Sequence, residues 1–451
     1  MRLSVHLPAA ARNPISLIGI AIATATAGLF LILLALDLLG YLANPYVGLI
    51  LFIGIPALFV GGLLLIAVGV RRARRQAPGT VHDWPVLDLR DPQQRSVAVA
   101  VLTLTFVNVV IVSIAAYGGI HYMETTAFCG TVCHTTMEPQ YVAHQRGPHA
   151  QVECVQCHVG PGAGALVQSK LAGTRQLFEV VTNRVPRPVP SPAELISPAR
   201  ETCERCHWPE RFVGDRTRTI REFANDEKNT ETDTVLQLHV GGGSLARGIG
   251  TGIHWHMNLQ NEIEFVSDAD KPESIPYVRL RDAAGNVREY FAEGASNPQI
   301  AAGRYQRMDC MDCHNRPAHT FAPNAMRAVD DAIAQGLIPR DLPFARRETV
   351  AAVRAVYPDR ASAMSGIESR LRTFYSSRSV DMRLVNRAVV GAQDVWASNV
   401  FPAMKVSWGT YPSNIGHVDS PGCFRCHDDT HKTKDGQHVI SQDCELCHTI
   451  Q

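Results

Sequence analysis

The chain has 451 residues, a formal net charge of +1 and 19% charged residues. This length allows two or three domains. A charge so close to zero argues against nucleic acid, or any strongly charged macromolecule, as a partner. The hydrophobic residues are not spread evenly, because long apolar runs gather near the N-terminus.

Three of these runs, at about residues 15–39, 47–70 and 97–119, predict membrane-spanning helices within a transmembrane region at 1–120. Each run is long enough to cross the hydrocarbon core of a lipid bilayer as a helix. A helix of a soluble core would show a polar face over such a length. The first run could instead be a cleaved signal peptide, but it is long for that purpose and no clear A-x-A site follows.

The basic loop at 71–95 predicts the orientation of this region. It carries six arginines against three aspartates, whereas the short segment between the first two runs has no charge. Basic loops stay on the cytoplasmic side. We therefore expect a multi-pass protein of the bacterial inner (cytoplasmic) membrane, with everything after residue 119 on the periplasmic side. A cleaved first run would leave that side unchanged.

Six cysteine pairs, each followed at once by a histidine, use all twelve cysteines. In a C-x-x-C-H motif the thiols bind haem covalently through its vinyl groups, and the histidine becomes an axial iron ligand. Zinc ribbons, redox dithiols and disulfides need no histidine at that position. Only 18 residues are histidines, so composition does not explain six of them there. The motifs therefore predict six haem c groups, numbered here in chain order.

The residues that would hold these haems can be read directly from the motifs. The predicted attachment residues are Cys129, Cys133, Cys154, Cys157, Cys203, Cys206, Cys310, Cys313, Cys423, Cys426, Cys444 and Cys447. The predicted motif ligands are His134, His158, His207, His314, His427 and His448.

An iron that only transfers electrons needs a second axial ligand, so that no other molecule binds to it. Ten more histidines follow residue 120 and could supply these distal ligands. The favoured candidates are His149, His254, His256, His319, His417 and His431. The sequence leaves open which of them belongs to which haem.

The exported part is predicted to be a mainly α multihaem cytochrome c domain with irregular loops and a small β insert. Its expected parts are 121–213 with haems 1–3, a β-containing insert at 214–305, and a helical region at 306–451 with haems 4–6. Alternating residues predict strands at 234–240, 262–267 and 277–291. Apolar spacing of three or four predicts helices at 324–334, 347–356, 361–375 and 382–398.

The first motif differs from the others, because three residues separate Cys129 from Cys133. Met137 lies three positions after His134, so its thioether is a candidate ligand that would raise the potential of this haem. Methionine is more often a packing residue, but here it lies next to a haem motif. Whether His134 or Met137 ligates this iron is left open.

A membrane helix that leads into CGTVCHTTM, followed by GPHAQVECVQCHVGPG, resembles the NapC/NirT family of membrane-anchored quinol dehydrogenases. The resemblance covers about residues 97–210. It implies that the first haem lies at the membrane surface, takes electrons from the quinol pool and has methionine ligation, which carries over onto Met137. The chain departs from the family in its longer first motif, its two additional spans and its six haems.

Quinol oxidation releases two protons with two electrons, so a quinol site needs a polar group beside an apolar slot. Residues 162–181 predict an amphipathic helix on the membrane surface, with Lys170 at its border. The family has a lysine in this stretch, and Lys170 resembles it. Its alternative role is that of a snorkelling surface lysine. Glu138 and Glu179 are further candidates for the proton acceptor.

These patterns together predict a membrane cytochrome that oxidises menaquinol or ubiquinol near haem 1. Its electrons would pass to a periplasmic redox protein or reductase in anaerobic-type respiration. One alternative is a terminal reductase of a small molecule, which needs an iron with an open coordination site. A second alternative is an electron-relay subunit without its own quinol site.

Overall fold

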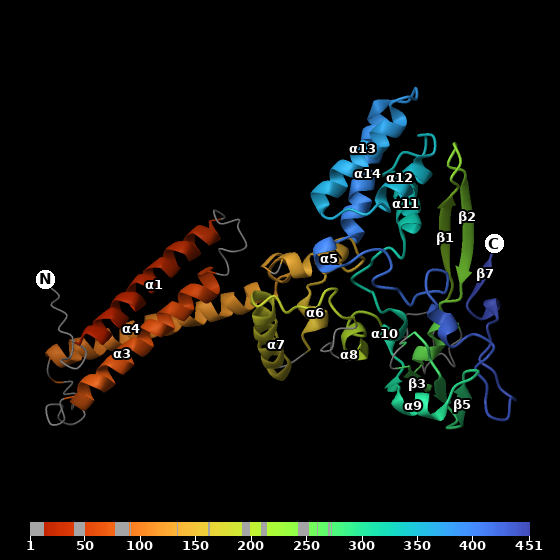
Figure 1. The fold of residues 1–451 in the computed structure, drawn as a ribbon. Helices are drawn as coiled ribbons and strands as arrows, with labels where there is room; N and C mark the ends of the chain where they lie inside the picture. The colour runs from red at the N-terminus through yellow and green to blue at the C-terminus, as the bar shows by residue number, and fades with distance from the viewer. Residues whose placement is uncertain are drawn as a thin grey trace. The chain divides into compact units, whose positions relative to one another are not determined.

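The structure is a computed structural model that describes most of the chain. The described residues are 13–39, 50–76, 90, 92–132, 134–160, 163–191, 199–208, 214–241, 252–258, 260–268, 271 and 273–451. The chain forms two compact units, Met1–Cys133 and His134–Gln451. Figure 1 shows the helices and strands of both.

The first unit consists of long apolar helices. Its elements are α1 (Pro14–Leu38), η2 (Ile50–Gly54), α3 (Ile55–Gln76), α4 (Pro92–Glu124) and η3 (Phe128–Val132). Among the described residues, three stretches are long and apolar enough to cross a membrane, namely Pro14–Leu36, Ile50–Ala73 and Thr103–Glu124. The prediction of three membrane-spanning helices in this region is confirmed.

Helices α1 and α3 pack closely through small residues. A Cβ atom on Gly19 would lie 2.6 Å from the backbone oxygen of Gly62, and one on Gly62 would lie 2.9 Å from the backbone nitrogen of Ala23. The Ser16 hydroxyl donates a hydrogen bond to the Ile66 carbonyl oxygen at 3.2 Å. Small residues and hydroxyl bonds of this kind are what hold helices together in lipid, where apolar burial gives little gain.

The second unit contains short helices around the cysteine motifs and longer ones in its C-terminal half. The helices are α5 (His134–Gln145), α6 (Val155–His158), α7 (Ala163–Val181), α8 (Ala199–Cys203), α9 (Asn297–Ala302), α10 (Cys310–Cys313), α11 (Ala325–Ala334), α12 (Ala345–Val353), α13 (Arg360–Tyr375) and α14 (Met382–Asn399). The 3-10 turns are η5 (Ile253–Met257), η6 (Pro402–Met404), η7 (Gly422–Arg425) and η8 (Cys444–Leu446). The four helices expected between residues 324 and 398 are present as α11 to α14, with small shifts at their ends.

The described part of the second unit also contains two antiparallel sheets. The strands are β1 (Arg216–Phe223), β2 (Glu231–Leu238), β3 (Glu262–Ser267), β4 (Tyr277–Arg281), β5 (Val287–Phe291), β6 (Arg304–Arg307) and β7 (His448–Ile450). Their orders are β1-β2-β7 and β5-β4-β3-β6. The strand expected at 262–267 is confirmed, and the one expected at 277–291 is the hairpin of β4 and β5. The sequence patterns did not predict β1, β6 or β7, and the alternating arginines and threonines of β1 are mostly exposed.

The largest apolar cluster lies among helices α11 to α14. It includes the fully buried side chains of Ile338, Leu371 and Trp396. A smaller cluster around Phe265 lies on the sheet that contains β3 and β4. The fold is therefore mainly α with small sheets, as the sequence predicts.

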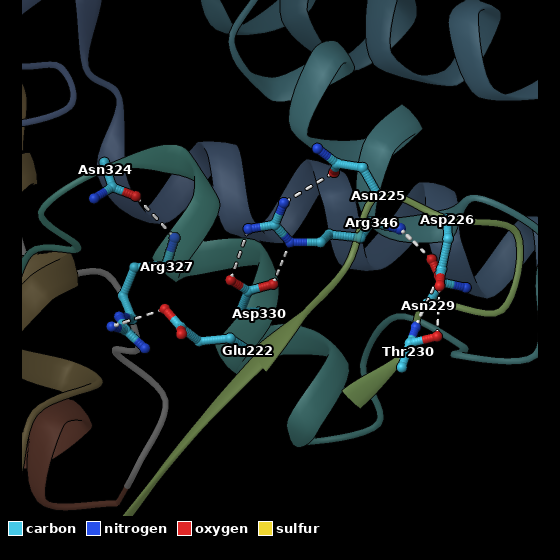
Figure 2. Close-up of polar contacts among 9 residues, drawn as sticks. All are labelled: Glu222, Asn225, Asp226, Asn229, Thr230, Asn324, Arg327, Asp330 and Arg346. Carbon is cyan, nitrogen blue, oxygen red and sulfur yellow. Dashed lines mark hydrogen bonds and ion pairs between the residues drawn. The ribbon is translucent and has the colours of Figure 1, made fainter. Parts of the chain in front are cut away.

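A polar network joins the β1–β2 hairpin to α11 and α12 (Figure 2). The Arg346 guanidinium donates hydrogen bonds to both carboxylate oxygens of Asp330, at 2.7 and 3.0 Å, and a third to Asn225 at 2.9 Å. Only 13% of the Arg346 side chain and 3% of the Asp330 side chain are exposed. Asn229, in the turn of the hairpin, accepts a hydrogen bond from the Arg346 backbone nitrogen. The ion pair therefore joins α12 to α11, and the bonds of Arg346 to Asn225 and Asn229 anchor the hairpin to these helices.

We expect Asp330→Asn to lower the free energy of unfolding of the second unit by about 3 kcal/mol, because the guanidinium would stay buried without its counter-charge. Denaturant unfolding followed by circular dichroism would measure this loss. Glu368→Gln is the matched control, since the Arg372–Glu368 pair is 41% and 45% exposed. Exposed pairs contribute about 1 kcal/mol or less. Equal losses in the two variants would contradict the anchoring role.

Candidate functional site

The second to fifth cysteine motifs each form one helical turn. In each, the backbone N–H of the motif histidine donates to the carbonyl oxygen of the first cysteine, at 2.8 to 3.0 Å. Residues three and four positions apart lie on the same side of such a turn. The two thiols and the imidazole therefore share one face, which is the arrangement that a covalently attached haem requires.

The sixth motif has a different backbone. The Cys447 N–H donates to the Cys444 carbonyl oxygen at 3.1 Å in the 3-10 turn η8. His448 then begins β7, which pairs with β2 through Leu238. The Nδ1 atom of His448 is buried and has no hydrogen-bond partner among the described residues.

The first motif is described in part. Cys129 lies in the π-helical turn η3, and its N–H donates to the Thr125 carbonyl oxygen at 3.2 Å. Cys133 and the side chain of His134 lie outside the described residues. Helix α5 begins at His134, and Met137 is half-buried in the first turn of this helix.

Each of the other five motif histidines faces a histidine from elsewhere in the second unit. The ring centroids lie 6.2 Å apart for His158 and His319, 6.0 Å for His207 and His149, 6.2 Å for His314 and His254, 5.8 Å for His427 and His256, and 6.0 Å for His448 and His417. With a metal–nitrogen bond of about 2 Å on each side, two axial imidazoles on one iron have centroids about 6 Å apart. The five pairs therefore fit a haem iron between their rings.

Hydrogen bonds hold four of the non-motif rings in one orientation. The Nδ1–H groups of these rings donate to backbone carbonyl oxygens: His149 to Pro317 at 2.9 Å, His254 to Val240 at 3.0 Å, His256 to Ile253 at 2.7 Å and His319 to Gln140 at 3.0 Å. A proton on Nδ1 leaves the lone pair on Nε2. Metal-binding histidines are oriented by bonds of this kind.

Burial keeps several of these imidazoles neutral. It lowers the pKa of His319 to about 4, an effect to which His158 and His144 add. Burial is also the main cause that lowers the pKa of His158, His256 and His314. A neutral imidazole is the form that binds iron, so these rings have the protonation state of ligands.

Two further histidines of the second unit, His431 and His144, have other contacts. His431 is almost fully buried, and its two ring nitrogens bond to the Asp428 carboxylate at 2.9 Å and the Ile275 carbonyl oxygen at 2.7 Å. His144 lies 6.1 Å from His319, but its Nε2–H donates to the Val152 carbonyl oxygen at 2.9 Å. His431 was expected to be an iron ligand, but neither of its ring nitrogens could bind iron without losing one of these hydrogen bonds.

The three candidates for the quinol site have different surroundings. The Glu138 carboxylate pairs with Arg360 at 3.2 Å, and that of Glu179 pairs with Arg175 one helical turn away at 2.9 Å. Lys170 is half-buried on α7, and its ammonium group has no ion-pair or hydrogen-bond partner among the residues that the structure describes. Of the three, Lys170 is therefore the one whose polar group is left for a ligand.

Helix α7 presents an apolar face to solvent. Its exposed apolar side chains are Val167, Leu171, Leu177, Phe178 and Val181, each more than half exposed. Lys170 lies on the same side of the helix, one turn after Val167 and two turns before Leu177. An exposed apolar stripe that includes a lysine is typical of a helix that contacts lipid.

Membrane-spanning helices followed by motifs of this kind define a membrane-anchored multihaem c-type cytochrome. The N-terminal region of the NapC/NirT cytochrome c family matches residues 91–188. The chain is 38% identical to the cytochrome c-type protein ImcH of Geobacter sulfurreducens over 97% of its own length and 88% of that protein. It is 25% identical to the cytochrome c-type protein TorC of Escherichia coli over 34% of its length and 40% of TorC.

The chain belongs to the NapC/NirT family of cytochromes c. Membership implies quinol-linked electron transfer and covalently bound haem c. No solved structure matches the chain.

Proposed function

We propose that the chain is a six-haem quinol dehydrogenase of the bacterial inner membrane, with its haems on the periplasmic side. The observation that carries this proposal is the family match at 91–188, which runs from the last membrane-spanning helix through the first two motifs and α7. A bound haem c supplies one-electron chemistry. The chain would hold six of them through the twelve motif cysteines and the histidine after each pair.

The site of quinol oxidation would lie beside the first motif. Quinol is apolar except for two hydroxyl groups, so its site needs apolar walls and a polar group at one end. The exposed apolar side chains of α7 would provide such a wall, and the Lys170 ammonium, which has no partner among the described residues, would hydrogen-bond a quinol oxygen. The paired carboxylates of Glu138 and Glu179 would have to leave their arginines to accept a proton.

Electrons would leave for a periplasmic redox protein or reductase. The alternative of a terminal reductase needs an iron with one open axial position. Five motif histidines already face a second histidine at about 6 Å, which argues against an open position at those sites. The alternative of a relay subunit differs from a quinol dehydrogenase only in lacking a quinol site. Reduction of the haems by added quinol therefore distinguishes these two functions.

A quinol reduction experiment tests the proposal. Detergent-purified protein would be mixed without oxygen with a reduced menaquinone analogue, and haem reduction would be followed by absorbance in a stopped-flow instrument. We expect rapid reduction that a quinone-site inhibitor blocks, and dithionite would define full reduction. Reduction by dithionite but not by quinol would refute the dehydrogenase and favour the relay subunit.

A further inference from the structure

We infer that five irons are each held between two specific histidines, and that these five sites follow one another in space in the order of their motifs. The pairs are His158 with His319, His207 with His149, His314 with His254, His427 with His256, and His448 with His417. This inference rests on the haem attachment in the proposed function, but not on quinol oxidation.

The pairing uses each of these motif histidines once and gives each a partner of its own. Among the described residues, a second histidine competes only at His319, whose ring lies 6.2 Å from His158 and 6.1 Å from His144. His144 uses its Nε2–H in a bond to Val152, whereas His158 follows a cysteine pair. Iron between His319 and His158 is therefore the arrangement that breaks no hydrogen bond.

Contacts between neighbouring pairs show the order of the second, third and fourth sites. The ring of His149, from the third site, bonds to the carbonyl oxygen of Pro317, two residues before His319 of the second site. The side chains of Cys203 and Cys310, from the third and fourth motifs, lie close enough to interact with each other. Helices α8 and α10, which carry these two cysteines, also pack together.

The same kind of contact continues to the last site. The single turn η5 carries both His254 of the fourth site and His256 of the fifth. The His417 ring, from the sixth site, stacks on Phe424 inside the fifth motif with centroids 4.1 Å apart. The Cys447 thiol also lies near enough to Cys423 to interact with it electrostatically.

The sixth site therefore ends the series, and it lies at the surface. Cys444 is exposed, as are Leu446 at 49% and Ile450 at 68%. Cys206 of the third motif is exposed as well, but its site has a neighbour on either side in the series. The geometry makes the sixth motif the place where a periplasmic acceptor would take up electrons.

Removal of single distal histidines tests the pairing. In dithionite-reduced protein, His254→Ala and His256→Ala should each bind one carbon monoxide per chain more than the unmodified protein, because each opens one axial position. His438→Ala is the matched control, since His438 is exposed and belongs to no pair, and it should bind no more than the unmodified protein. Haem content, measured as the pyridine haemochrome, should remain unchanged in all three.

The ring planes add a spectroscopic signature that distinguishes the two variants. The rings of His254 and His314 are 3° from parallel, whereas those of His256 and His427 are 81° apart. Near-parallel axial planes give a rhombic low-spin resonance, and near-perpendicular planes give one with a large maximal g value. In the oxidised protein, His254→Ala should therefore remove a signal of the first type and His256→Ala one of the second.

If an alanine variant does not acquire its haems, a methionine variant can still test the pairing. His256→Met should keep its iron six-coordinate and raise the midpoint potential of one haem, because a thioether replaces an imidazole. An unchanged carbon monoxide stoichiometry in His254→Ala and His256→Ala, or a gain in His438→Ala, would overturn the pairing. Because these measurements use dithionite, a failure of the quinol reaction would leave them interpretable.

Discussion

Replacing both cysteines of the last motif, Cys444→Ala with Cys447→Ala, is expected to lower the haem content from six to five and leave all five reducible by quinol. The reason is that the sixth site ends the series, so its loss interrupts no other connection. The same double replacement in the fourth motif, Cys310→Ala with Cys313→Ala, also leaves five haems. In this variant, quinol should rapidly reduce only haems 1–3, which precede the missing fourth haem.

Haem content by pyridine haemochrome and the fraction reduced by the menaquinone analogue would be measured on both proteins. Circular dichroism would show that each has kept its fold. Equal fractions of quinol-reducible haem in the two variants would contradict the linear order. A loss of quinol reduction at every haem in the Cys444→Ala, Cys447→Ala protein would place the last motif at the entrance instead of the exit.

Replacing Lys170 by methionine is expected to slow quinol-dependent haem reduction by about 10² to 10⁴, the usual contribution of one positioned proton-transfer or hydrogen-bonding group. Methionine keeps much of the apolar stem of lysine but removes the ammonium group. Lys170→Arg should recover part of the rate, because a guanidinium also donates hydrogen bonds. Reduction by dithionite should not change in either variant.

The two carboxylates provide the comparison for Lys170. Glu138→Gln and Glu179→Gln should have little effect on the rate, since both groups are already paired with arginines. Stopped-flow reduction with the menaquinone analogue would give all four rates under one set of conditions. A normal rate in Lys170→Met together with a large loss in Glu138→Gln would show that Lys170 is only a lipid-facing lysine and that Glu138 accepts the proton.

Helices and strands whose pattern depends only on residues close together in sequence could be predicted from the sequence. Apolar runs predicted the three membrane-spanning helices, and apolar spacing predicted α11 to α14, because both patterns follow from the geometry of a single helix. Alternation predicted β3, whose faces are unequal. The same rule missed β1, β6 and β7, because an exposed or very short strand shows no clear alternation of buried and exposed residues.

The sequence by itself determined which histidine belongs to which cysteine pair. The histidine directly follows the second cysteine, and in one helical turn this spacing puts the imidazole on the same face as the two thiols. It also supplied the candidates for the second ligand, yet it left their pairing open. Only the tertiary structure decided that His319 faces His158 and His256 faces His427, and that both nitrogens of His431 are already in use. The physical reason for the histidine pairings is distance along the chain: His319 and His158, like His256 and His427, come from segments far apart in sequence, and only the packing of the whole second unit brings their rings to a spacing that one iron can bridge.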